Sequence, residues 1–330
     1  MTKFESSLVS MDTSARMTLL QEALPYTPSE DVRSGSHLSS NDTLFDEILA
    51  AASENVPTVS EGELSLGLVI GNGYVLSALP ELPVDGLVMA DIAPQISAWE
   101  KFLGGLILKA ETRQEFIEGT GPDSGELCRQ LAAEAGQVRY ERINQFESEP
   151  YTLPYPVPRW FKEEVEILGD YHFLSSEERY QECREASRRT PVVYAQIDMT
   201  KPEQVAKVTD GMRSVGGRLT FMNLTNLVEH ATHEWPEYRE SLESLPLHED
   251  VFIARSSCSK EYEPGKFTHS PHPISSWVRG LAGYISECKR TPHPFFGGKL
   301  LEADEREAQA RENLRQQGWT DEDLSRWASG

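Results

Sequence analysis

Short apolar runs alternate with amphipathic segments through the middle of the chain. The runs occupy residues 64–70, 86–90, 192–197, 218–222 and 251–254. Runs of this length, with little polar alternation, are typical of parallel strands buried on both faces of a sheet. Between them, apolar residues recur at helical spacing in residues 94–118, 175–189 and 202–215. The pattern predicts an α/β fold with an open, doubly wound and mostly parallel sheet.

The rest of the chain divides around this sheet. Residues 1–60 are polar and contain two short amphipathic segments, which predict an N-terminal helical cap. Residues 61–290 form the expected α/β domain, with an insertion at roughly 119–190 that includes the proline-rich segment 151–160. Residues 277–288 read as a further helix, and residues 291–330 as a C-terminal helical extension.

Polar residues follow the first two predicted strands, where open α/β sheets bind their ligands. Gly71, Asn72 and Gly73 come directly after the first strand, and glycines there allow a sharp turn and close approach to a ligand. Asp91 closes the second strand, with Ile92 beside it. A carboxylate at that position can accept hydrogen bonds from a ribose diol, and its separation from the glycines is close to the roughly 20 residues expected.

The third and fourth strands also end in polar residues. Asp198, followed by Met199, closes the third strand, and its carboxylate can accept a hydrogen bond from the exocyclic amine of adenine. It can equally cap the helix that follows. Asn223 and Asn226 follow the fourth strand, and their amides could orient an amino-acid group or a nucleophilic amine without carrying charge.

Taken together, residues 63–256 resemble the class I S-adenosylmethionine-dependent methyltransferases. The resemblance rests on the glycine turn at residues 71–73, the strand-end acids Asp91 and Asp198, and the segment Asn-Leu-Thr-Asn at residues 223–226. It implies a Rossmann-like fold that binds S-adenosylmethionine through Gly71 to Gly73, Asp91, Ile92, Asp198, Met199 and Asn223. It also implies transfer of a methyl group, with Asn223 and Asn226 in the catalytic region.

Two departures from the family pattern keep another reaction open. The segment at 223–226 lacks the prolines and the aromatic residue of the family motif, and Val69 stands where the family has an acid before the glycines. A few proteins of this fold use the aminocarboxypropyl arm of S-adenosylmethionine, either transferring it or cyclising it to azetidine-2-carboxylate. Tyr155 and its aromatic neighbours in the insertion could stabilise a sulfonium by cation–π contact in such a reaction, or simply form the apolar surface of the insertion.

The charge of the chain limits its partners. With 53 acidic and 31 basic residues among 330, the net charge is −22, which disfavours nucleic acid and anionic membrane surfaces. A small-molecule substrate is expected. The N-terminus has no apolar signal segment and the four cysteines are scattered, so we expect a cytoplasmic protein without a cysteine metal site.

Other classes of site have weaker support. His230 lies in the segment Val-Glu-His-Ala-Thr-His-Glu, which is not a zinc motif, but it could act as a general base. Neither a nucleophile elbow nor a P-loop sequence occurs. An NAD(P)-dependent oxidoreductase stays open as an alternative, although Leu76 replaces the third glycine of the dinucleotide fingerprint. A binding protein without catalysis stays open as well.

Overall fold

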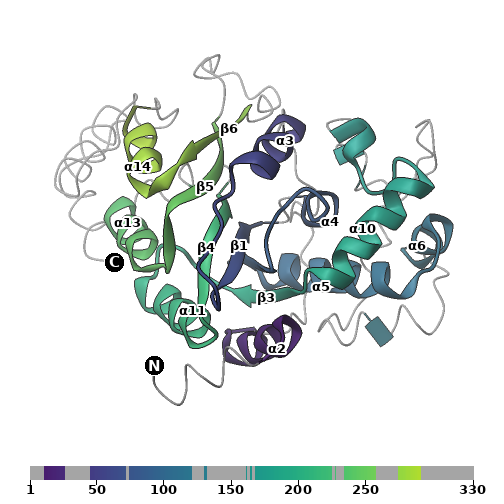
Figure 1. Cartoon of the computed structure of the whole chain (residues 1–330), viewed down its shortest axis with the longest axis horizontal. Coiled ribbons are helices and arrows are strands. Elements are labelled where there is room, and N and C mark those ends of the chain that lie inside the picture. The colour runs from purple at the N-terminus through teal and green to yellow at the C-terminus, as the bar shows by residue number, and fades with distance from the viewer. Residues whose placement is uncertain are drawn as a thin grey trace, which may run out of the picture.

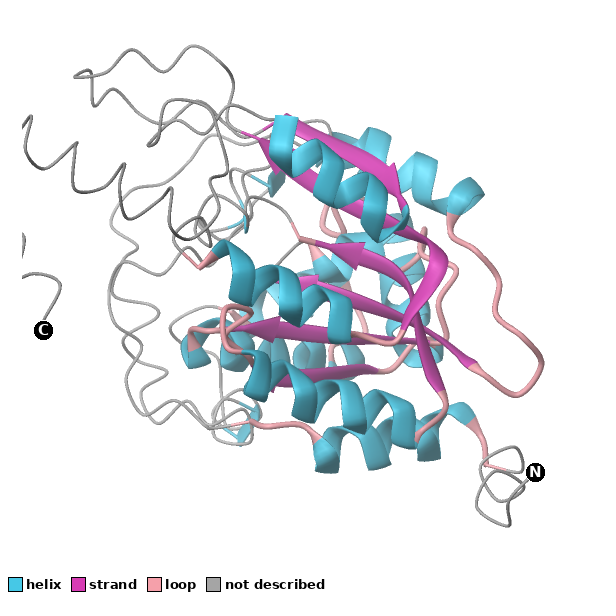
Figure 2. Ribbon diagram, turned by 90° about the vertical axis from the view of Figure 1, so that its left-hand side faces the viewer, coloured by secondary structure: helices cyan, strands magenta, loops and turns pink. Residues whose placement is uncertain are grey.

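The protein is built on a single six-stranded sheet. The computed structural model describes residues 11–26, 45–71, 74–120, 130–131, 161, 164–165, 168–224, 227, 234–257 and 274–290. The strands of the sheet lie side by side in the order β3-β2-β1-β4-β5-β6 (Figure 2). Their bounds are β1 Leu64–Ile70, β2 Gly86–Asp91, β3 Val192–Gln196, β4 Gly217–Asn223, β5 Leu247–Ser257 and β6 Ile274–Arg279.

The first five strands are parallel, and only β6 runs antiparallel to its neighbour β5. All seven residues of β1 and all six of β2 are buried. Continuous burial is the physical reason for the apolar runs in the sequence, because both faces of each strand are covered. The expected α/β fold with an open, mostly parallel sheet is thus confirmed.

Helices cover both faces of the sheet, which makes three layers (Figure 1). On one face, apolar side chains of the strands pack in one core cluster with those of four helices. These helices are α2 (Thr13–Ala23), α11 (Pro202–Ser214), α13 (Trp235–Ser244) and α14 (Gly280–Arg290). The opposite face carries α3 (Phe45–Asn55), α4 (Val75–Ala78), α5 (Pro94–Lys109) and α10 (Glu177–Arg189).

A second apolar cluster lies outside the sheet on that face. It joins α5 and α10 to α6 (Arg113–Gly119) and to residues near the one-turn 3-10 helix η3 (Gly169–Tyr171). Phe116 and Phe173 meet edge to face at 5.2 Å, and Tyr180 donates a hydrogen bond to Ala110 O. These contacts fix α10 against α5.

The helix α2 protects the exposed edge of the sheet. β3 is an edge strand, and the side-chain amide of Gln21 both accepts from Tyr194 N (2.7 Å) and donates to Tyr194 O (2.9 Å). Pro25 O accepts from Gln196 N at 2.7 Å. These bonds replace a missing neighbouring strand, because an unpaired edge would otherwise present free backbone groups. Whether residues 1–60 form a separate cap stays a prediction.

Two helix predictions were wrong in their extent. The single helix expected at 94–118 is two helices, because Thr112 caps α6 by accepting from Glu115 N at 3.1 Å. The sequence Thr-Arg-Gln-Glu at 112–115 is a capping-box signal that the apolar periodicity concealed. The helix expected at 277–288 begins only at Gly280, since Trp277 to Arg279 pair with β5 as the end of β6.

The structure also contains α13, which the sequence analysis did not predict. No helix in the described parts of the chain is both long and apolar enough to cross a membrane.

Candidate functional site at the strand ends

The carboxyl ends of four parallel strands bring the predicted ligand-binding residues to one edge of the sheet. Ile70 pairs with Ala90, Asp91 with Gln196, and Val69 with Asn223. Gly71, which directly follows β1, therefore lies level with Asp91, the last residue of β2. Neighbouring strands are about 4.8 Å apart, so the four strand ends from β3 to β4 extend over about 14 Å.

Gly71 adopts a backbone conformation that favours glycine. Its φ is +79°, and its N–H donates to Ala90 O at 3.0 Å. An added Cβ would lie 3.9 Å from Asp91 Oδ2. The missing side chain leaves this carboxylate oxygen bordered by bare backbone, and such a surface lets a ligand approach closely.

Asp91 is a buried acid at the end of β2, with 9% of its surface exposed. Its Oδ1 accepts from Ala93 N at 2.6 Å. Burial raises the pKa of the Asp91 carboxyl to about 6, and hydrogen bonds from the backbone of Ala93 and Ile92 offset only part of that effect. The neighbouring hydrogen bonds therefore do not fully offset the cost of burying the charged carboxylate. Such perturbed groups are common at functional sites.

The residues next to Asp91 differ in exposure. Ile92 is 61% exposed, and Gln196 Nε2 donates to its carbonyl oxygen at 3.3 Å. The main chain of Asp91 accepts from Ile197 N at 3.0 Å, which holds the start of the β3 loop against β2. An exposed apolar side chain beside a buried acid provides a flat contact surface next to a hydrogen-bond acceptor.

Asp198 is satisfied by its own turn. Its Oδ1 accepts from both Thr200 N (2.9 Å) and Thr200 Oγ1 (2.7 Å), and its N–H donates to Gln204 Oε1 at 3.0 Å. The side chain of Asp198 therefore stabilises the turn that precedes α11 and uses one of its two carboxylate oxygens, whereas α11 itself begins after Lys201 without a side-chain cap. Met199 is buried, with 3% of its surface exposed.

Asn223 occupies the last position of β4, level with Val69 of β1, and is 1% exposed. The next residue, Leu224, donates its N–H to Ala254 O at 3.0 Å, so β4 and β5 stay paired up to this point. The strand ends therefore bring Gly71, Asp91 and Asn223 to neighbouring positions, with Asp198 at the outer end. Asn72, Gly73, Tyr155, Asn226 and His230 lie outside the described residues, and their roles stay predictions.

A group of buried ionisable residues lies nearby and was missed in the sequence. Glu100 of α5, Glu164 and His172 are all at most 5% exposed, and His172 Nε2 lies 3.5 Å from Glu164 Oε2. Burial, together with the charge of Glu164, raises the pKa of Glu100 well above its usual value. Burial lowers the pKa of His172 despite the carboxylate beside it.

Glu100 and Glu164 line a very small cavity together with residues of α4. The cavity has a volume of about 10 Å³ and is also lined by Tyr74, Ser77 and Phe173. One water molecule needs about that volume, so the cavity is too small for a substrate. The sequence did contain a sign of this buried group: Glu100 is a charged residue between Trp99 and Phe102, on the apolar side of a helix. No cluster of three metal-ligating side chains occurs within the described ranges.

Comparisons with known proteins give a family and a distant structural likeness. Residues 56–287 match the family model described as "Domain of unknown function (DUF7790)". Two solved structures of the rRNA methyltransferase aviRa from Streptomyces viridochromogenes match with TM-scores of 0.38 and 0.39 and identities of 13% and 15%. The matches cover 85% and 84% of this chain and 95% and 96% of those chains. No curated protein matches the sequence significantly. Because the structural likeness is low, the functional argument depends on the site itself.

Proposed function

This chain belongs to the DUF7790 family, a domain of unknown function, and from its strand-end site we propose that it is an S-adenosylmethionine-dependent transferase. The proposed reaction is methyl transfer to a small molecule. The observation that carries the proposal is the buried carboxylate of Asp91, which lies beside the bare backbone of Gly71 at the carboxyl ends of adjacent strands.

Asp91 has the chemistry that a ribose diol requires. A carboxylate accepts two hydrogen bonds from neighbouring hydroxyl groups, and such charge-assisted bonds are stronger than neutral ones. Oδ1 already accepts a hydrogen bond from Ala93 N, which orients the carboxylate. Oδ2 lies next to Gly71, on the side where a Cβ of that residue would be. A ribose bound there would give a partner to a charge that burial makes unfavourable.

The neighbouring residues fit the remaining parts of the cofactor. Ile92 offers an exposed apolar surface for the adenine ring, and the second oxygen of Asp198 could accept from its amine. Asn223 lies on the other side of β1, where the amino-acid end would extend. When bound, S-adenosylmethionine supplies a methyl group on a sulfonium. The part of this chain is to bind and orient the nucleoside.

The topology supports a nucleoside ligand over a dinucleotide. Dinucleotide-binding sheets of this strand order combine two βαβαβ halves, each of which binds one mononucleotide. Here β1, β2 and β3 with their helices form one such half, but β4 and β5 are followed by the antiparallel strand β6. The second half is incomplete, which counts against an NAD(P)-dependent oxidoreductase.

The net charge of −22 supports a small acceptor, because an acidic surface repels phosphate backbones. The aminocarboxypropyl reaction stays the alternative, since it is favoured by the departures at residues 223–226.

A binding experiment tests the proposal. S-adenosylmethionine should raise the melting temperature of the native protein, whereas NAD and NADP should not. Asp91→Ala should weaken the affinity on the order of 100-fold, because two charge-assisted hydrogen bonds are lost. Asp210→Ala, an exposed acid on α11, is the matched control and should leave the affinity unchanged. Equal affinities for the two variants, or stabilisation by NAD alone, would refute the proposed site.

The products distinguish the reactions. Incubation with S-adenosylmethionine and candidate acceptors, followed by mass spectrometry, should give S-adenosylhomocysteine only when an acceptor is present. Methylthioadenosine formed without an acceptor would instead identify the aminocarboxypropyl chemistry. Asn223→Ala should lower turnover more than affinity, and normal turnover in this variant would exclude Asn223 from the reaction.

A further inference from the structure

We propose that Glu100 and Glu164 share one proton and form a pH-sensitive switch, which releases α4 from α5 when this proton is lost. The two residues line the same cavity of about 10 Å³, which has room for one water molecule. The helix α4 begins shortly after Gly71, so a movement of α4 acts on the strand-end site. The proposal does not depend on which ligand that site binds.

The carboxyl group of Glu100 is buried without a hydrogen-bond donor. The residue is 5% exposed, and none of the described residues donates a hydrogen bond to its side chain. Burial and the neighbouring charge of Glu164 both raise the pKa of Glu100 well above its usual value. The proton therefore stays on this carboxyl at pH values at which an exposed glutamate has lost it.

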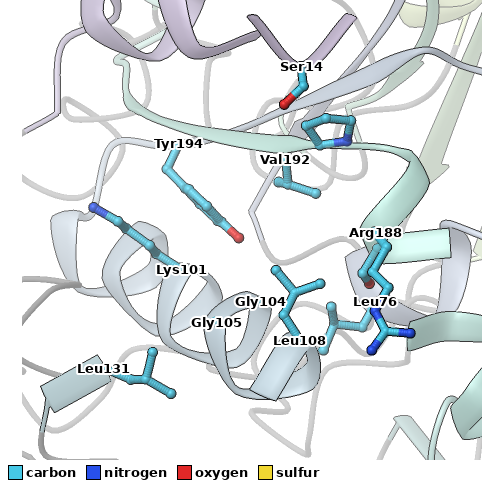
Figure 3. A pocket seen from close by; sticks show the side chains of 12 residues that line it. Ser14, Leu76, Lys101, Gly104, Gly105, Leu108, Leu131, Arg188, Val192 and Tyr194 are labelled. Atoms are coloured by element: carbon cyan, nitrogen blue, oxygen red, sulfur yellow. The ribbon is translucent and has the colours of Figure 1, made fainter. Parts of the chain in front are cut away.

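The other side of α5 faces a larger cavity, which is separate from the carboxyl of Glu100. Lys101 and Gly104 line this larger space of about 510 Å³, whereas Glu100 and Leu103 line the small one (Figure 3). Figure 3 shows the ring of Tyr194 reaching toward α5, where its hydroxyl group donates to Glu100 O at 3.3 Å. Solvent that enters the larger cavity therefore does not hydrate the carboxyl group.

His172 supports the charge of Glu164 but does not neutralise it. Leu174 N donates to His172 Nδ1 at 3.1 Å, which places the proton of a neutral imidazole on Nε2. Nε2 lies 3.5 Å from Glu164 Oε2, so the N–H faces the carboxylate. Burial lowers the pKa of His172, which keeps the ring neutral. A second carboxylate at Glu100 would therefore meet no positive charge from this side.

The helix α4 is the wall of the cavity that is held least firmly. It is four residues long, and its preceding residue, Tyr74, lines the cavity with a φ of +55°, which is unfavourable for a residue with a side chain. Two hydrogen bonds hold it from outside: Arg179 Nη2 donates to Ser77 O at 3.0 Å, and Phe173 N donates to Ser77 Oγ at 3.1 Å. Arg179 is itself paired with Glu81 at 2.9 Å, so its charge is already engaged.

Loss of the proton places two carboxylates at one small cavity. Space for a single water molecule does not hydrate two like charges, so further water must enter and the walls must separate. Because α5 has sixteen residues and α4 only four, α4 is the wall that moves. The folded chain binds the proton more tightly than the unfolded chain, in which the pKa of Glu100 is 4.5. Its stabilising effect is complete below that pH and is lost as the pH rises through the raised pKa.

The pH dependence of the melting temperature tests the proton. Glu100→Gln replaces the protonated carboxyl by an uncharged group of the same shape. Its melting temperature relative to the native protein should rise by about 3 °C or more between pH 5.5 and pH 8.5. The lowered pKa of His172 acts in the opposite direction, but it affects both proteins and cancels in the comparison. Glu178→Gln, at an exposed position of α10, is the matched control and should follow the native protein. A difference that stays constant with pH would overturn the proposal.

Infrared spectroscopy detects the proton directly, because the C=O stretch of a protonated carboxylic acid is separate from the bands of carboxylates. At pH 7 the native protein and Glu178→Gln should both show such a band, and Glu100→Gln should lack it. Identical spectra of the native protein and Glu100→Gln in this region would mean that Glu100 is ionised, and the switch would be excluded.

Hydrogen exchange followed by mass spectrometry shows whether α4 responds to the proton. After correction for the intrinsic effect of pH, the amides of α4 in the native protein should exchange about tenfold faster at pH 8.5 than at pH 6, and those of α5 should not change. Glu100→Gln should abolish this difference. Glu164→Gln, which removes the like charge, should reduce it by about half or more. Equal loosening of α4 and α5, or an unchanged response in Glu164→Gln, would refute a shared proton that controls α4.

Discussion

Replacing Asp91 by asparagine should stabilise the ligand-free protein and weaken its binding of S-adenosylmethionine. The pKa of the buried carboxyl is raised from 3.8 to about 6. At about 1.4 kcal/mol for each pKa unit, ionising Asp91 at neutral pH removes up to about 3 kcal/mol of stability. Asparagine keeps an oxygen for the bond from Ala93 N but carries no charge. We therefore expect the free energy of unfolding to rise by about 1–3 kcal/mol at pH 7. The lower value applies if the NH2 group of the asparagine faces the backbone N–H of Ile92, so that the hydrogen bond from this N–H is lost.

The gain should depend on pH in a definite direction. The folded state binds the proton of Asp91 more tightly than the unfolded state, so the contribution of this group is fully favourable below pH 3.8 and is lost as the pH rises to about 6. The stability of Asp91→Asn relative to the native protein should therefore increase between about pH 4 and pH 6 and be constant above about pH 7.

Urea denaturation of both proteins at pH 4.5 to 7.5, followed by circular dichroism, measures this difference. The same samples with S-adenosylmethionine should show the opposite order, because the native protein binds the ligand more tightly and is stabilised more by it. A variant that is less stable than the native protein at pH 7, or a difference that does not change with pH, would refute the reasoning about the buried charge.

Three further substitutions test the local structure around the site and the sheet. Gly71→Ala should cost about 1–2 kcal/mol in urea denaturation, because its φ of +79° is strained for a side chain, and an unchanged midpoint would contradict that conformation. Gln21→Leu should cost about 2 kcal/mol, since both backbone groups of Tyr194 lose their partner, whereas Glu22→Leu on the exposed side of α2 should not. Thr112→Ala should lower the free energy of unfolding by about 1 kcal/mol through the cap of α6, with Thr112→Ser restoring it; equal stability of the two variants would argue against the cap.

The strands were predictable because burial on both faces leaves a direct trace in the sequence. Residues 64–70 are β1 in full, whereas β2 and β4 each end one residue beyond the predicted runs, at Asp91 and Asn223. Their parallel direction then follows from the helical segments that connect them. The order of the strands, in contrast, depends on packing between distant segments, and the antiparallel course of β6 has no local signal.

Helix limits were less predictable, because apolar periodicity continues across breaks that hydrogen bonds create. Residues 94–118 keep one apolar face through α5 and α6, although Thr112 begins a new helix. At residues 277–279 the alternation of Trp, Val and Arg fits both a helix and a strand, and pairing with β5 decides for the strand. The protection of the β3 edge by Gln21 could not be predicted at all, since 173 positions separate it from Tyr194.

The two strand-end acids show why position in the sequence does not settle a binding role. Asp91 and Asp198 both follow buried strands, and their sequence contexts are alike. Yet Asp198 receives two hydrogen bonds from Thr200 within its own turn, so the stability of that turn alone accounts for it. The raised pKa of Asp91 indicates that burying its charge costs free energy, and that its hydrogen bonds from the backbone do not fully offset this cost. A folded chain retains such a group where a ligand supplies the missing partner, which makes Asp91, rather than Asp198, the residue on which binding should depend most strongly.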